Sequence, residues 1–557
     1  MKKPSKEKLT YYFEEAKTYK DDIKGDYNET FELTDTSFTI KDDASRRKSV
    51  SRKVDSVVLE SQRFLSNFIM ISVFPKSQKW AELKSNLDVI KVIEEVNDST
   101  AEMIKKELDE ILEENSETVY RTNSNTNYYT EVAKSVSDCL KVGTGIFKIV
   151  ELNSTAKPFT YSYQNLDNIF FLEDMQGKPN IVFKRYVEKN LEDLMDMFGH
   201  LNFKKPESLN NEEELTEKIS VIETIIAEFD ENKAVNIYHH FVHTEEFEEE
   251  LVYEVLEYNP YVIFRWQVDS SNPWGIGIGR ANKHLIQQLN ENIEKRARHR
   301  DKIVDPPANF YGDISLRNKV SLKPGAINYG GEWNDANKMG IQPINLGTNL
   351  IPIEQDINDC RERIRKAYMA QPLGDVLETK NRSATEMEIR QEMFRSEFSG
   401  TYELINTELL EPIFMNAYYI LEKKGLLNTL ENEDYVTHSK IHYVNELTQN
   451  SGREYGLRII DFYNMASQLV PEEQRGFIIK SAEAVEDIRD KMNIPASIVN
   501  SKDEIIELVE NQRRLLEIET LAQAQENVGK RQETGIPERV KQGVGGLGDI
   551  WWQRKKK

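Results

Sequence analysis

Cysteine is almost absent from this sequence of 557 residues, which contains only Cys139 and Cys360. Two thiols are too few for a disulfide framework or a cysteine-rich zinc site, so we expect both to be buried. Long apolar runs are also missing, because the strongest one, residues 67–74, is far shorter than the roughly 20 residues that cross a bilayer. No apolar segment follows the first lysines, so we expect no secretory signal. These absences predict a cytoplasmic product without a membrane partner.

Positive charge is scarce as well, since 73 lysines and arginines stand against 95 aspartates and glutamates, for a net charge of -22. This balance excludes a surface built to grip nucleic acid by neutralising phosphates, so a DNA partner would be held loosely. No GxxxxGK[ST] motif occurs, and Gly275, Gly277 and Gly279 do not form GxGxxG. The chain therefore lacks a Walker-type phosphate cradle, and we expect neither ATP hydrolysis nor a cofactor.

A metal site has one candidate, the histidines His239, His240 and His243. They lack the HExxH pattern and occur in a strand-like run, which predicts imidazoles on the face of a sheet and no bound metal. The many carboxylates still leave a second hypothesis open, a metal-dependent nucleic-acid-processing enzyme, because a carboxylate site cannot be recognised by counting acidic residues.

The patterns that are present predict an α+β, mainly helical fold with about two to four packed regions. Residues 1–45 predict a loosely held arm with at most one short helix. Helical periodicity covers residues 49–74, 90–114 and 128–140, and an acidic stretch at residues 211–229 also reads as a helix. Alternating apolar residues predict strands at residues 145–152, 168–174, 180–187, 234–243 and 261–268.

The second half begins after a glycine-rich boundary at residues 271–279. Residues 280–302 and 353–369 predict two helices, and residues 308–350 between them carry six glycines among short strands, which predicts a small β module. Each helix has only a narrow apolar stripe: Leu285, Leu289 and Ile293 on the first, Ile357 and Ile364 on the second. Such a pair cannot enclose a core alone, so we expect identical copies to bury the stripes in a closed ring. The same order of elements also occurs in monomers.

Longer helical patterns follow. Residues 383–386 form a capping box that begins a helix running to residue 424, which Gly400 and Pro412 should bend. Helical patterns return between residues 459 and 525, and residues 528–557 predict a glycine-rich, basic tail.

Several of these segments resemble portal proteins, the head-to-tail connectors of short-tailed, podovirus-like bacteriophages. The resemblance lies in FLSNFIMISVFPKSQKWAEL (residues 64–83), SDCLKVGTGIFKI (137–149), NPWGIGIGRANKHLIQQLNENIEK (272–295) and, most strongly, in residues 383–421 with their mid-helix glycine and proline. It covers most of residues 60–425, and the order of the patterns along the chain supports it more than any single one.

The resemblance implies a homo-dodecameric ring at one capsid vertex, present in the virion and assembled in the host cytoplasm. Its partners would be double-stranded DNA held without sequence specificity, the terminase packaging motor, a tail adaptor, and the major capsid and scaffolding proteins. The implied regions are an N-terminal arm (1–45), wing (46–279), first stem helix (280–304), clip (305–350), second stem helix (351–369), tunnel loop (370–382), long helix with the rest of the wing (383–458), crown (459–527) and mobile tail (528–557).

Two groups of residues are candidate contact sites under this interpretation. Lys380, Asn381 and Arg382 on the tunnel loop would touch DNA, or they are simply solvated loop residues. The basic cluster Lys295, Arg296, Arg298 and Arg300 near the end of the first stem helix would stabilise the helix dipole or form intersubunit salt bridges, or it would face DNA or the tail. Under this interpretation we expect a structural function and not an enzymatic one.

Overall fold

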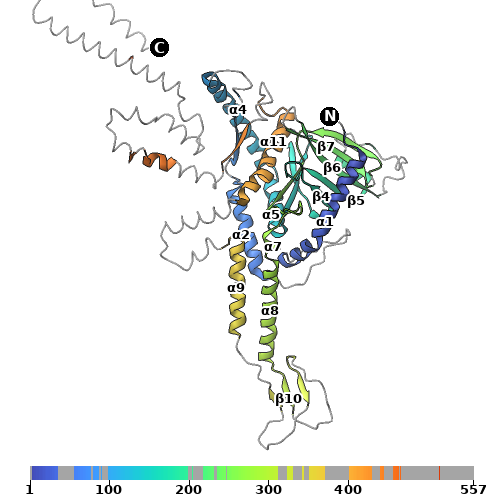
Figure 1. Ribbon diagram of the computed structural model, residues 1–557, viewed down its shortest axis with the longest axis vertical. Helices are drawn as coiled ribbons and strands as arrows, with labels where there is room; N and C mark the ends of the chain where they lie inside the picture. Colours follow the sequence, from blue (N-terminus) through green and yellow to red (C-terminus); the bar gives the residue numbers. More distant parts are fainter. Residues whose placement is uncertain are drawn as a thin grey trace, which may run out of the picture. The chain divides into compact units, whose positions relative to one another are not determined.

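The computed structural model describes residues 3–35, 55–76, 79–86, 90, 98–198, 204, 218–230, 235–245, 247–310, 323–329, 341–343, 350–370, 400–428, 439–444, 456–462, 464–465 and 514. The chain divides into two compact units, Met1–Thr448 and Gln449–Lys557. In the second unit, residues 456–462, 464–465 and 514 are helical. All elements below belong to the first unit, which mixes helices and sheets as the sequence predicts (Figure 1).

The helices of this unit are α1 (Lys6–Thr34), α2 (Ser56–Ser72), α4 (Asp98–Ser124), α5 (Tyr128–Val142), α6 (Leu191–Phe198), α7 (Ile278–Ala281), α8 (Lys283–Val304), α9 (Ile351–Ala367) and α11 (Glu411–Lys423). A 3-10 turn, η1 (Leu166–Asn168), and a π-helical turn, η5 (Asn406–Leu410), complete them. None of the described helices is long and apolar enough to cross a bilayer.

The described strands form four sheets. The largest is antiparallel, in the order β4 (Ile169–Leu172), β5 (Ile181–Asn190), β6 (Lys218–Asp230), β7 (Val235–Thr244) and β8 (Glu250–Leu256). A second sheet has the order β3 (Phe159–Tyr163), β2 (Thr144–Glu151) and β9 (Tyr261–Arg265). The small ones are β11 (Ile327–Tyr329), β10 (Ala308–Phe310) and β12 (Ile341–Pro343), and the pair β1 (Ala81–Lys84) and β13 (Lys440–Tyr443).

Two clusters of apolar side chains bury the two faces of the five-stranded sheet. On one face, Phe183 and Phe241 pack against Leu9 and Ala16 of α1. On the other face, residues such as Val182 belong to a cluster shared with β2, β9 and Trp274. The strand alternation of β5 explains the division, because neighbouring side chains of a strand point to opposite faces.

The structure corrects the prediction for the N-terminal segment. Residues 6–34 form one 29-residue helix, not a loosely held arm with a short helix. The side chain of Ser5 accepts a hydrogen bond from the backbone N–H of Lys8 and caps the helix. The buried residues recur at helical spacing: Leu9, Ala16, Ile23, Tyr27 and Phe31. The charged residues between them mask this stripe in the sequence.

The acidic helix predicted at residues 211–229 is also wrong. Residues 218–230 form β6, the central strand of the largest sheet, and residues 205–217 lie outside the described residues. Six of its residues are β-branched: Ile219, Val221, Ile222, Thr224, Ile225 and Ile226. Such side chains favour a strand, and β6 pairs on both edges, with β5 and β7.

Several further side chains are buried, and the cysteines and histidines among them follow the predictions. Trp80 is buried and contacts Phe74 and Phe414, with ring centroids 5.6 and 6.1 Å away. Cys139 and Cys360 are buried thiols. The three neighbouring histidines lie on β7, as the strand-like run predicted. His243 packs against the rings of Phe241 and Phe247 and is 5% exposed.

Lowering the pH from 7.5 to 5 is expected to destabilise the protein through His243. Burial lowers the pKa of this imidazole to about 4. An unfolded chain takes up the proton near pH 6.5, so the contribution of the neutral imidazole is complete above that pH and is lost as the pH falls toward 4. We expect a loss of about 2 kcal/mol at pH 5. His243→Phe should remove this part of the pH dependence in urea unfolding, and equal slopes for both proteins would contradict the prediction.

Candidate functional site: a helical pair and its buried anchor

Helices α8 and α9 lie side by side and form a pair that leads to the sheet of β10, β11 and β12 (Figure 1). This confirms the predicted order of helix, small β module and helix. The side chains that meet between the two helices, and against α2, are almost completely buried: Ile286 and Leu289 on α8, and Ile357, Cys360 and Ile364 on α9. Asp55, which caps α2, accepts a hydrogen bond from Arg361 at 2.8 Å and fixes α9 to α2.

The structure limits the role predicted for the apolar stripes. Leu289, Ile357 and Ile364 have 0%, 1% and 0% of their surface exposed within one chain. These three side chains therefore have almost no surface left for a second copy, so only Leu285 and Ile293 of the predicted set remain open to packing between subunits. Leu285 and Ile293 are partly buried against the same core. Helix α8 packs against α9, and α9 also packs against α2, an arrangement that a sequence pattern does not reveal.

The outer faces of the pair are charged. Lys295 and Arg298 are largely exposed and form ion pairs with Glu291 and Glu294, one turn earlier on α8. Arg300 is exposed and Arg296 is partly buried. Exposed pairs of this kind stabilise a helix by only about 0.3–0.5 kcal/mol. These ion pairs therefore contribute little to the stability of α8.

The part of α9 that lies beside the basic end of α8 carries negative charges. Four exposed carboxylates lie along its N-terminal part: Glu354, Asp356, Asp359 and Glu362. The chain enters α9 from the β module into which α8 leads, so the end of α8 and the start of α9 lie at the same end of the pair (Figure 1). The pair thus has a basic α8 face and an acidic α9 face at that end.

Three glycines anchor the base of the pair by close backbone packing. Gly143 ends α5 in a left-handed conformation, with φ of 113°. A Cβ atom on Gly275 or on Gly277 would lie less than 3.0 Å from backbone atoms of Gly143. The segment expected to mark a boundary, residues 271–279, is therefore tightly packed against α5 before it enters α7 and α8.

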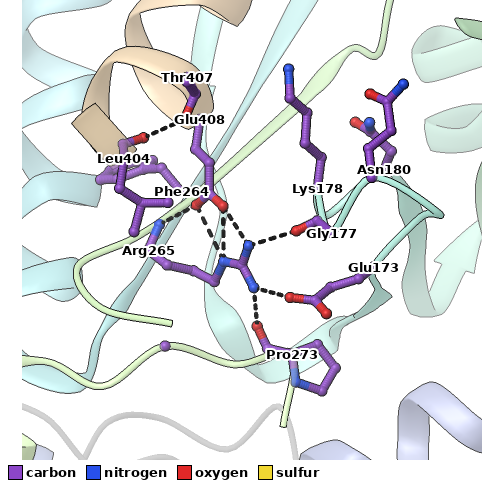
Figure 2. A network of polar contacts seen from close by, with 12 residues as sticks. Glu173, Gly177, Lys178, Asn180, Phe264, Arg265, Pro273, Leu404, Thr407 and Glu408 are labelled. Atoms are coloured by element: carbon purple, nitrogen blue, oxygen red, sulfur yellow. Dashed lines mark hydrogen bonds and ion pairs between the residues drawn. The ribbon is translucent and has the colours of Figure 1, made fainter. Parts of the chain in front are cut away.

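Arg265, at the end of β9, is the centre of a buried polar network (Figure 2). Its Nε donates to both carboxylate oxygens of Glu408, at 3.1 and 3.2 Å, and its backbone N–H donates to Oε2 at 2.9 Å. The guanidinium also donates to Glu173 and to the carbonyl oxygens of Gly177 (2.9 Å) and Pro273 (3.2 Å). Burial opposes the charge of Arg265, but Glu408 and Glu173 outweigh that effect and raise its pKa.

The network closes the base of the pair on both sides. Pro273 precedes α7 and α8, and Glu408 follows α9 on the next described helical segment. Glu408 lies within the π-helical turn η5, and such turns occur often at functional sites. One arginine thus holds both the outgoing and the returning chain. The sequence analysis missed this site, because nothing in the pattern around Arg265 pairs it with a carboxylate 143 residues away.

The remaining predicted contacts lie elsewhere. Lys380, Asn381 and Arg382 fall outside the described residues, as do most of residues 459–557. Within the part of the chain that the structure describes, no group of three or more His, Cys, Asp or Glu side chains is placed to hold a metal ion. The hypothesis of a metal-dependent enzyme therefore gains no site from these residues.

A comparison with known protein families agrees with the resemblance seen in the sequence. A family model described as "Bacteriophage head to tail connecting protein" matches residues 6–499. No curated protein matches the chain. Among solved structures, a chain from the "Virion of native gene transfer agent (GTA) particle" has 9% sequence identity and a TM-score of 0.34, over 81% of this chain and 92% of that chain. Because the family model spans most of the sequence, this protein belongs to the family of bacteriophage head to tail connecting proteins.

Proposed function

We propose that copies of this structural protein form a ring in which the α8–α9 pairs stand side by side around a central channel for double-stranded DNA. The family gives the protein its role as a structural connector between the head and tail of a virion. The observation that supports a ring is the charge of the pair. Residues 295–302 carry five cations and one anion, whereas residues 351–362 carry four anions and one cation.

In a ring, each copy contacts its two neighbours through two different faces. In a cyclic assembly every interface joins the same two different surfaces, so one face of a copy always meets the other face of its neighbour. The basic face of α8 would then meet the acidic face of α9 in the next copy. This replaces the buried residues of the stripes as the expected contact, and it keeps the intersubunit salt bridges that the sequence suggested for Lys295, Arg296, Arg298 and Arg300.

The finer assignments follow from the resemblance and belong to the same proposal. The ring would be dodecameric, with residues 280–304 and 351–369 as the stem, and residues 305–350 as the clip that binds a tail adaptor. Residues 46–279 would form the wing and residues 459–527 the crown. Lys380, Asn381 and Arg382 would contact DNA during packaging and ejection. The terminase motor and the capsid and scaffolding proteins would be further partners.

Reversing the charge of the basic face should prevent ring formation. In Lys295→Glu/Arg298→Glu, the α8 face would repel the acidic α9 face of the neighbour. Negative-stain electron microscopy and light scattering should show rings with a central hole for the natural protein and single chains for this variant. Adding Asp356→Lys and Asp359→Lys should restore the rings, because the two faces are then complementary again.

A matched control separates this effect from the change in net charge. Lys134→Glu/Lys157→Glu makes the same charge change at exposed positions far along the chain from α8 and should leave the rings intact. Rings that persist in the α8 variant would refute the charge contact between α8 and α9. A natural protein that remains a single chain at high concentration would refute the ring itself.

A further inference from the structure

A cavity of about 1520 Å³ lies away from the α8–α9 pair, beside α1, β5 and α6. Seven basic and five acidic side chains line it, in a protein whose overall charge is strongly negative. The aromatic rings of Phe170, Phe198 and Trp274 form part of its wall. We therefore examined which carboxylates neutralise these cations.

One buried carboxylate contacts the lining residues Lys148 and Tyr186, and its two oxygens already accept four hydrogen bonds. Glu223 on β6 is fully buried, and its Oε1 accepts hydrogen bonds from Lys148 at 2.6 Å and His240 at 2.9 Å. Its Oε2 accepts from the hydroxyls of Tyr186 at 2.9 Å and Tyr261 at 2.6 Å. Four donors occupy the two oxygens, so Glu223 has little capacity for another cation.

Lys184 is a further cation beside Glu223, and it makes no hydrogen bond to that carboxylate. It stands opposite Glu223 in the register of β5 and β6, lines the cavity and is only 9% exposed. Among the described residues its ammonium group has no hydrogen bond and no ion pair, and the Tyr186 ring centre lies 5.9 Å away. Lys20, by contrast, donates to the carbonyl oxygens of Leu166 at 2.7 Å and Ile169 at 3.0 Å.

Lys184 is largely buried and its ammonium group faces the cavity, so desolvation lowers its pKa to about 8, against the opposing effect of the Glu223 charge. Charged groups in this position are normally neutralised by a partner. Glu223 opposite Lys184 compensates part of its charge, but no described residue accepts a hydrogen bond from the ammonium group, which leaves that position in the cavity open to a ligand.

We propose that this cavity binds an oxyanion, a phosphate or carboxylate group of a small solute, through the ammonium group of Lys184. The partly exposed ring of Phe170 offers an apolar surface for the rest of such a molecule. The site does not depend on the proposed contact between α8 and α9 of neighbouring copies, because none of its lining residues lies on either helix.

Titration of the full-length protein tests the site. Sodium phosphate and sodium glutamate would be compared with sodium chloride at constant ionic strength, by thermal unfolding and by isothermal titration calorimetry. We expect saturable binding and a rise in Tm with phosphate, with glutamate or with both, and the response tells the two sources of the oxyanion apart. A response to neither anion overturns the proposal without any variant.

Two variants connect the binding to Lys184. Lys184→Met and Lys184→Gln should weaken binding by about tenfold or more, as expected for the loss of a charge-assisted hydrogen bond. Without added anion both should be at least as stable as the natural protein, because an unpaired buried charge has been removed. The control Lys189→Met, at a less buried lysine of the same cavity, should change affinity less than about twofold. Unchanged binding in the Lys184 variants would overturn the assignment of Lys184.

Discussion

Replacing Arg265 by methionine is expected to lower the free energy of unfolding by about 3–5 kcal/mol, the usual cost of leaving one partner of a buried ion pair alone. Glu408, only 5% exposed, would lose the hydrogen bonds of the guanidinium, and the carbonyl oxygens of Gly177 and Pro273 would lose a donor. Urea unfolding followed by circular dichroism measures the change. The ends of the segment that contains α8 and α9 should also become more sensitive to proteolysis.

The matched changes decide how the effect arises. Arg298→Met removes an exposed ion pair of α8 and should cost less than about 1 kcal/mol. The double variant Arg265→Met/Glu408→Met should be more stable than the sum of the two single changes, because no buried charge is left alone. If Arg265→Met were as mild as Arg298→Met, the network could not be the anchor of the helical pair.

Gly275→Ala is expected to destabilise the protein by about 3 kcal/mol, at the upper end for overpacking. The new Cβ would lie less than 3.0 Å from the carbonyl oxygen of Gly143. A backbone atom cannot rotate away as a flexible side chain can, so α5 and the chain entering α7 would have to separate. Thermal unfolding should show the loss.

Gly25→Ala is the matched control, because the same chemical change should stabilise the protein there. Gly25 lies inside α1, and a Cβ there would meet nothing within 4 Å. Alanine favours a helix interior over glycine by about 0.5–1 kcal/mol, so this variant should be slightly more stable. Destabilisation by both changes would mean that close packing at Gly275 is not the cause.

Much of the local structure could be predicted because its signals lie within the segment itself. The helical pattern of residues 49–74 stops before Pro75, which cannot continue a helix, and α2 ends at Ser72. The periodicity of residues 280–302 and 353–369 matched α8 and α9 within a few residues. The five alternating runs all correspond to strands, namely β2, β4, β5, β7 and β9. The periodicity of apolar residues and the positions of proline and glycine are local signals, so they can be recognised in a single sequence.

What the sequence did not predict depends on partners that lie far away in the chain. The stripe of α8 was identified correctly, but its own residues did not show that α9 packs against it within the same chain. Helix α1 was read as an arm because charged residues separate the positions that the sheet buries. Strand β6 was read as a helix because its partners, β5 and β7, are not visible in its own residues.

The sequence by itself determined the secondary structure of most segments, the absence of a phosphate-loop motif, the negative charge and the resemblance to phage connectors, because composition, spacing and order are properties of the linear chain. Only the tertiary structure decided which faces meet, that Arg265 joins Glu408 and Pro273, and that Lys184 faces a cavity while Glu223 already accepts four hydrogen bonds. These facts depend on contacts between residues far apart in the chain, and burial changes the energy of a charged side chain without leaving a trace in the local sequence.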